Sequence, residues 1–275
     1  MPIEFLIFLT VFTPALVGGL NLIFNKNPNV RDTVTLVGAL ITFYFSANIF
    51  LGFDGQATQY KLATIMPGID ISFHIEPLGI IFSMLASGLW ILTHIYAIGY
   101  MRGAKEKNHS RFFFFFSVSI ASVMGISFSG NLFTLFLFYE ILTLITFPLV
   151  SHKGSTEALR GARVYLSILL GTSIGLQLLG IIWIYFSVGT LDFVKGGILN
   201  DSLGSIELVI LVGLFAFGIG KAALFPFHRW LPAAMVAPTP VSALLHAVAV
   251  VKAGVFTVLK VGIYTFGVDS LSQKL

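Results

Sequence analysis

Long apolar stretches dominate the chain, and short polar segments separate them. A helix needs about 20 such residues to cross the hydrocarbon core of a bilayer. Eight stretches reach or approach that length: 2–24, 32–52, 77–99, 112–129, 131–150, 164–188, 206–225 and 241–267. The pattern predicts an all-α, multi-pass membrane protein with about eight transmembrane helices, which form a single membrane domain over residues 1–275.

Two segments interrupt this pattern. Residues 60–79 show a partial alternation of apolar and polar positions around Pro67-Gly68, which predicts an extramembrane β-hairpin. Pro226 lacks an amide donor and clashes with the preceding helical turn. We therefore expect the seventh helix to break near Pro226 and to resume as a short re-entrant helix through Trp230, as in the broken helices that line transporter sites.

The basic residues are divided unevenly between the two sets of loops. Three of the sixteen lysines and arginines lie within apolar stretches and three lie in one set of loops, whereas ten lie in the other set: Lys26, Arg31, Arg102, Lys105, Lys107, Arg111, Lys153, Arg160, Arg163 and Arg229. Loops rich in these residues stay in the cytoplasm. This asymmetry predicts a protein of the cytoplasmic (inner) membrane with both termini on the non-cytoplasmic side. The net charge of +4 is explained by orientation, so we expect no nucleic-acid partner.

The composition also excludes several kinds of chemistry. The sequence contains no cysteine, which rules out disulfides, thiolate metal sites and cysteine nucleophiles. It shows no glycine-rich phosphate loop, metal-ligand cluster or triad-like grouping. We therefore expect no cofactor, no metal and no catalytic chemistry in this chain. The first 24 residues lack a basic segment and a small-residue cleavage site, so we expect a retained first helix.

Four ionisable residues within the apolar stretches are candidates for function, because such a group costs roughly 2.5–3.5 kcal/mol in a membrane. Glu140 lies halfway along its stretch, near the bilayer midplane, and Lys221 lies just before the break at Pro226. Lys252 lies too deep to reach either surface easily, whereas Lys260 is close enough to the outer surface to extend toward it. The alternative for each is a structural role, as a hydrogen-bonded carboxyl or a lysine that extends to the interface.

Two histidines accompany these residues. His246 precedes Lys252 by six residues, a rise of about 9 Å along a helix, which one or two water molecules can bridge. It is either a proton relay or a hydrogen-bonded packing residue. His228, beside the break, is either a proton entrance or a cap for local backbone groups. Because the charge of a buried lysine depends on a nearby carboxylate, these residue types indicate ion translocation.

The segment GKAALFPFHRWLPAAMVAPTPVSALLHAVAVVKAG, with FYEILTLITFPLV, resembles the antiporter-like membrane subunits shared by respiratory complex I and the Mrp-type multisubunit cation/proton antiporters. The resemblance covers essentially the whole chain. It implies three leading helices with the hairpin (1–99) and one five-helix repeat (112–267). It also implies a proton path of Glu140, Lys221, His246 and Lys252, with His228 and Lys260 as further candidates.

The chain departs from the family pattern because members usually contain a second, inverted five-helix repeat. We therefore expect it to be half of a split subunit or a fragment, with a partner chain supplying the second repeat beside other membrane subunits. The leading hypothesis is proton translocation, alone or in exchange for Na⁺. The alternatives are the same module in a redox-driven complex I or membrane hydrogenase relative, a role in inorganic-carbon uptake, and a structural scaffold subunit.

Overall fold

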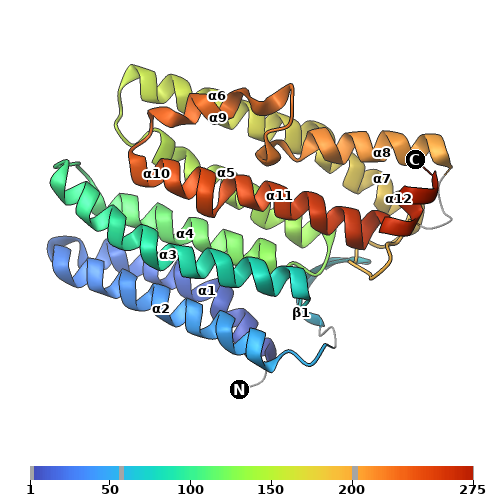
Figure 1. Ribbon diagram of the computed structural model, residues 1–275, viewed down its shortest axis with the longest axis horizontal. Coiled ribbons are helices and arrows are strands. Elements are labelled where there is room, and N and C mark those ends of the chain that lie inside the picture. Colours follow the sequence, from blue (N-terminus) through green and yellow to red (C-terminus); the bar gives the residue numbers. More distant parts are fainter. Residues whose placement is uncertain (1–2, 56–58, 200–203, 275) are drawn as a thin grey trace.

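The computed structural model describes residues 3–55, 59–199 and 204–274, which form a bundle of helices that share a common long axis (Figure 1). The elements are, in chain order, α1 (Ile3–Ile23), η1 (Phe24–Lys26), α2 (Pro28–Gly52), β1 (Gln59–Met66), β2 (Ile69–His74), α3 (Pro77–Gly103), α4 (His109–Ser127), α5 (Leu132–Val150), α6 (Thr156–Thr172), η2 (Ser173–Gln177), α7 (Leu178–Val188), α8 (Ser205–Gly218), η3 (Gly220–Ala222), η4 (Phe227–Arg229), α9 (Trp230–Ala233), η5 (Ala234–Val236), α10 (Thr239–Ala243), η6 (Leu244–Val248), α11 (Val250–Val261), η7 (Gly262–Phe266) and α12 (Val268–Lys274).

The helices cross the bundle in sequence order up to α9, and α10 and α11 then return to its middle (Figure 1). Helices α1 and α2 form one edge, α3 and α4 pack beside them, and α6 to α9 form the opposite edge (Figure 1). Helices α5 and α11 lie between these groups. The start of α1, the β-strands and the end of α11 share one end of the bundle, which we call the hairpin end. The opposite end carries Lys26, Arg102 and Lys153, and we call it the basic end.

The predicted all-α membrane architecture is confirmed. Seven helical segments of the described chain are long and apolar enough to cross a membrane: Ile3–Lys26, Pro28–Gly52, Pro77–Gly103, His109–Ser127, Leu132–Val150, Thr156–Val188 and Thr239–Phe266. The remaining predicted stretch, 206–225, is a shorter apolar helix, α8, followed by irregular backbone. Two of the long segments include π-helical turns, η2 in one and η6 and η7 in the other, a distortion that is frequent at functional sites.

The helix break expected near Pro226 is present, but it starts earlier than the proline. Helix α8 ends at Gly218, where a side chain is excluded because a Cβ atom would lie 2.4 Å from the backbone nitrogen of Gln177. A single 3₁₀ turn follows, and Ala223 then adopts the left-handed conformation with φ of 56°. The indole nitrogen of Trp230 donates a hydrogen bond to the carbonyl of Gly220 (2.9 Å). The same carbonyl also accepts from the amide of Ala223 (3.0 Å), so it is paired at the break, as burial in a membrane protein requires.

The predicted hairpin is confirmed as an antiparallel pair of strands, β1 and β2, joined at Pro67-Gly68. It is fixed to the turn between α4 and α5, where the amide of His74 donates to the carbonyl of Phe128 (2.7 Å) and that of Gly130 to Ser72 (2.8 Å). A Cβ atom on Gly130 would lie 2.6 Å from the Ser72 hydroxyl, so the close approach requires glycine. The hairpin therefore covers one end of the helices that carry the candidate site.

Candidate functional site

Lys221 is fully buried at the helix break. Its ammonium nitrogen donates hydrogen bonds to the carbonyl of Tyr139 (2.8 Å) and to the hydroxyl of Thr143 (2.5 Å), both on α5. Its backbone amide donates to the Tyr139 hydroxyl (3.0 Å). The break is what brings the lysine there: the single turn η3 turns the chain toward α5, so backbone and side chain of the same residue contact one helix. The two acceptors of the ammonium group are neutral oxygens.

Glu140 follows Tyr139 on α5 and is half-buried. Both of its carboxyl oxygens are shielded from solvent, and neither accepts a hydrogen bond from the described residues. No ion pair joins Glu140 to Lys221 within this part of the chain, although the lysine is anchored on the adjacent residue. A buried carboxyl without a partner loses the stabilisation that a hydrogen bond or counter-charge supplies. The carboxyl and the ammonium are therefore neighbours that do not neutralise each other by direct contact.

The histidines expected in the path lie in different surroundings. His246 is half-buried in the π turn η6; its Nδ1 atom is 3.3 Å from the Ser242 hydroxyl, while its Nε2 atom has no hydrogen-bond partner among the described residues. Its ring centroid is 6.5 Å from that of Trp230, the residue that braces the break. His228 is exposed and stacks on Phe225 beside Pro226. Geometry therefore places His246, and not His228, next to the buried break.

The burial expected for the two lysines of α11 is reversed. Lys252 is exposed in this chain, whereas Lys260 is 0% exposed and forms an ion pair with Glu76 (2.7 Å). Depth along a span does not determine which face of the helix a residue occupies. On α11 the buried face carries Ala253, Phe256, Thr257 and Lys260, at the three-to-four-residue spacing of one helix face. Lys252 lies on the other face, and of the two alternatives for Lys260 the structure has the buried lysine and not the one that extends to the surface.

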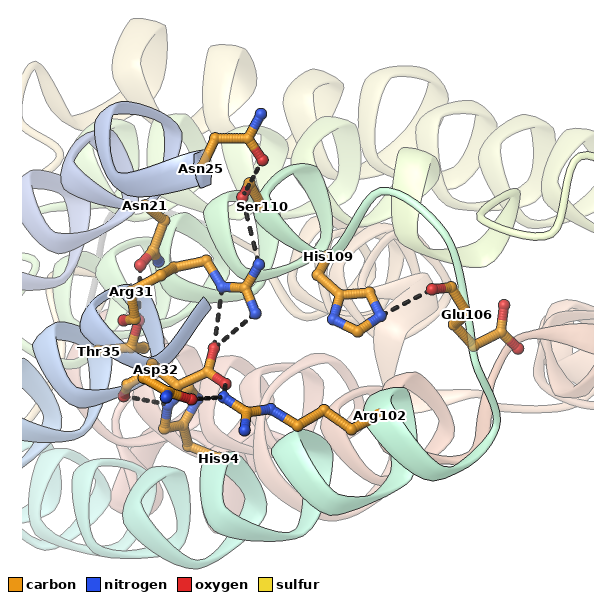
Figure 2. Close-up of polar contacts among 11 residues, drawn as sticks. Asn21, Asn25, Arg31, Asp32, Thr35, His94, Arg102, Glu106, His109 and Ser110 are labelled. Carbon is orange, nitrogen blue, oxygen red and sulfur yellow. Dashed lines mark hydrogen bonds and ion pairs between the residues drawn. The ribbon is translucent and has the colours of Figure 1, made fainter. Parts of the chain in front are cut away.

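Figure 2 shows a further charged cluster at the basic end that the sequence reasoning missed. Asp32 accepts hydrogen bonds from Arg31 (2.9 and 2.7 Å) and from Arg102, and its backbone carbonyl lies 3.1 Å from Nε2 of His94. The guanidinium of Arg31 also reaches Ser110 on α4 (3.4 Å). The adjacent Arg31 and Asp32 could have indicated an ion pair, but the sequence analysis used Arg31 only as a loop charge that marks orientation. Glu76 was missed in the same way.

Comparison with known proteins supports the fold and the family. The profile described as NADH:quinone oxidoreductase/Mrp antiporter, TM, matches residues 129–272, and the profile of the complex I chain 5 N-terminus matches residues 66–113. A putative antiporter subunit mnhA2 of Staphylococcus haemolyticus is 33% identical over 236 residues, which are 82% of this chain and 28% of the relative. The NADH-quinone oxidoreductase subunit L of Campylobacter jejuni is 30% identical over 86% of this chain and 39% of its own length.

A solved structure gives the same result for the fold. A chain of the Mrp complex from Dietzia sp. DQ12-45-1b superposes with a TM-score of 0.78 and 23% identity, over 91% of this chain and 27% of that one. This chain therefore spans well under half the length of the proteins it matches. The family profile covers the hairpin-end turn of α5, Glu140, the broken helix and all of α11. On this match, the chain belongs to the NADH:quinone oxidoreductase/Mrp antiporter family of membrane subunits.

Proposed function

We propose that this chain is the proton-translocating half of an antiporter-like subunit, with Glu140, Lys221 and His246 as its internal proton carriers. The observation that carries the proposal is the burial of Lys221 at a helix break, held by two neutral oxygens beside a carboxyl that lacks a direct partner. Charges in such surroundings interact strongly because little solvent screens them. A change in the charge of Glu140 therefore alters the protonation of Lys221, and this coupling is the element that a proton pump requires.

Lys252 supports the part of the proposal that concerns a partner. It lies on an exposed face of α11 together with Val255 and Leu259, in the middle of a membrane-spanning segment. A lysine that faces lipid at this depth is costly. We infer that protein covers this face in the assembled complex, and that the covering chain is the one that supplies the second five-helix repeat. Lys252 then passes protons from His246 across that interface.

Orientation in the membrane follows from the charges at the two ends of the bundle. The basic end carries most of the loop lysines and arginines, so we place it in the cytoplasm of a cytoplasmic (inner) membrane. The hairpin end, with the first and last described helical residues, then faces the non-cytoplasmic side. Protons enter from one side, cross through the Glu140–Lys221 site, and leave on the other, alone or in exchange for Na⁺.

A variant at Lys221 tests the proposal. The Lys221→Ala variant, assembled in its native complex in inverted membrane vesicles, should lose proton translocation measured with a pH-sensitive dye. Its partner subunits should still co-purify, because the acceptors left behind are neutral. The matched control is Lys105→Ala, an exposed residue of the basic end. Full translocation by the Lys221→Ala complex would refute the role of this lysine and favour a scaffold subunit.

A second candidate function places the same path in a redox-driven complex, because one relative is named as an NADH-quinone oxidoreductase subunit. The two candidates share the site and differ in their partners. Gentle-detergent purification from the native membrane, followed by mass spectrometry, separates them. Iron–sulfur or flavin subunits that co-purify with the chain would support the redox-driven pump. Small membrane subunits alone would support cation/proton exchange.

A further inference from the structure

A second buried ion pair lies at the hairpin end, away from Glu140 and Lys221. Nζ of Lys260 is 2.7 Å from Oε1 of Glu76, and the two side chains are 0% and 2% exposed. Lys260 belongs to α11, and Glu76 is the residue that precedes α3. The carbonyl of Ser127, at the end of α4, lies 3.4 Å from the same nitrogen. The pair thus joins three helices directly beneath the hairpin.

The second oxygen of Glu76 faces a group that can exchange protons. Oε2 lies 4.0 Å from Nδ1 of His74, on β2, and accepts no hydrogen bond from the residues that the structure describes. Burial lowers the pKa of His74, so its imidazole is neutral at neutral pH and can accept a proton. Among the described residues, further ionisable groups near the carboxyl and the imidazole are Tyr264 of η7, Asp192 and Lys195.

A cavity of about 440 Å³ borders this cluster. Glu76, His74 and Tyr264 line it, together with Lys195 on the loop that follows α7 and Phe53 at the end of α2. A cavity of this size accommodates many water molecules, each of which needs only a few tens of Å³. The carboxyl therefore borders a space at the hairpin end of the bundle that is large enough for water.

Helix α11 connects the pair to the central site. Gly254 packs directly on η3, because a Cβ atom there would lie 2.4 Å from the carbonyl carbon of Lys221. Lys260 follows Gly254 by six residues, a rise of about 9 Å. Thr257, which is fully buried, places a hydroxyl on the same face of the helix between them. One helix face thus leads from the back of Lys221 to the Glu76–Lys260 pair.

We propose that Glu76, Lys260 and His74 form the site at which protons exchange between the central path and the hairpin side of the membrane, an inference that rests on the proposed function. A proton that reaches Glu76 converts the carboxylate beside the ammonium of Lys260 into a neutral carboxylic acid. The proton then leaves Oε2 for Nδ1 of His74 and enters the cavity from the imidazole. The pair returns to its charged form, ready to accept the next proton.

Substitutions of Glu76 test this role in the native complex. The Glu76→Gln variant keeps the shape of the side chain but carries no exchangeable carboxyl proton, so translocation should fall by about 100-fold, the low end of what a positioned proton donor or acceptor contributes. The Glu76→Asp variant should restore most of the rate. The His74→Gln variant should shift the dependence of the rate on the pH of the hairpin side. Aspartate would also restore a purely structural ion pair, so the shift in the pH dependence is the result that such a pair would not give.

A double variant covers the case in which a lone Glu76→Gln substitution prevents assembly by leaving Lys260 unpaired. Glu76→Gln with Lys260→Met removes both charges together, which buried pairs commonly tolerate. The assembled double variant should translocate as poorly as Glu76→Gln. Full translocation with an unchanged pH profile would overturn the exchange site. If Lys221→Ala still abolished transport, only the exchange site would fail; if Lys221→Ala were also active, the proposed function would fail with it.

Access from the hairpin side can be measured without transport. The chain contains no native cysteine, so an introduced one is its only thiol. Ile263 lines the cavity, whereas Ala253 on α11 is 0% exposed and makes a matched control. The Ile263→Cys variant should react with a membrane-impermeant maleimide only when the hairpin side faces the reagent, and Ala253→Cys should not react from either side. Failure of Ile263→Cys to react from the hairpin side would overturn the proposed route.

Discussion

Asp32 and Glu140 are both shielded carboxylates within helices of one bundle, but they differ in their partners. Asp32 binds two arginines, from its own helix and from α3, and is 4% exposed. Glu140 is without a hydrogen-bond or ion-pair partner among the described residues, and the ammonium group next to it binds neutral oxygens. The charge of Asp32 is therefore neutralised by direct ion pairs with arginines, whereas Glu140 has no direct ion pair among the described residues.

On this difference we expect Asp32 to have a structural role and Glu140 to have the proposed role in transport. A carboxylate held by two guanidinium groups is fixed in its charged form, and releasing it would leave the buried Arg31 unpaired. A carboxyl without direct partners can change its charge with less disturbance of its neighbours. Substitutions at the two positions should therefore affect different properties: stability and assembly at Asp32, and transport at Glu140.

The largest expected effect is at the basic end. The Asp32→Asn variant leaves Arg31 buried without its counter-charge, and breaking such a pair costs about 3–5 kcal/mol. The purified variant should therefore unfold at a lower temperature in detergent and accumulate poorly in the membrane. The Arg102→Gln variant is the control, because the Arg102 side chain is 43% exposed and its loss should cost much less. Equal stability of the Asp32→Asn variant and the wild type would contradict the structural role.

The Glu140→Gln variant should show the opposite behaviour. Its stability should stay close to that of the wild type, because no direct ion pair or hydrogen bond is lost. Proton translocation should fall by about 100-fold, as expected when a positioned proton carrier is removed. Dye-based transport assays and thermal unfolding of the same preparation measure both properties. Unfolding without a transport defect in the assembled fraction would erase the distinction between the two carboxylates.

A third prediction concerns the packing that holds Lys221 in place. The Gly254→Ala variant adds a Cβ atom against backbone atoms of η3, and such overpacking costs about 1–3 kcal/mol. Translocation should decrease with stability because the break must move away from α11. Gly99→Ala on α3 is the matched control, since no atom lies within 4 Å of the added carbon. An undisturbed Gly254→Ala variant would show that the break does not depend on this contact.

The smallest effect should come from His152, in the turn that follows α5. Burial, with a further contribution from Arg111, lowers the pKa of His152. The unfolded chain therefore binds a proton at a higher pH than the folded chain, and stability is lost as the pH falls below about 6.5. When the pH falls from about 7.5 to about 5.5, the free energy of unfolding should decrease in the wild type. The decrease should be smaller in the His152→Gln variant, by on the order of 1 kcal/mol. Thermal unfolding at each pH in detergent measures this difference, and identical pH profiles would contradict it.

The sequence was sufficient for the architecture because long apolar stretches and the distribution of charges in loops are local properties of the chain. It was also sufficient for the hairpin, whose turn residues are adjacent in sequence. The residue at which the break starts could not be predicted from the sequence. Pro226 is easily recognised, but α8 ends at Gly218, where the chain packs against the backbone of Gln177. This contact joins residues that are distant in sequence.

The charged pairs were the least predictable part of the site. Depth within a span suggested that Lys252 was more deeply buried than Lys260, and the packing of α11 reversed the order. Glu76 lies at the edge of a predicted helix, where an acidic residue is ordinary, and only the fold brings it to Lys260. The roles of Glu140, Lys221, His246 and Lys252 in a proton path remain predictions that the proposed transport assays address.

The attachment of the hairpin has a consequence for biogenesis. Residues 59–74 leave the ribosome before the turn around Gly130 to which they bind, and Asn131 completes the attachment by donating to the carbonyl of Asp70 (2.7 Å). The strands can therefore acquire their final contacts only after α4 and α5 have been synthesised and inserted as a pair. Protection of the hairpin from protease during synthesis would mark the moment at which the first half of the bundle has assembled.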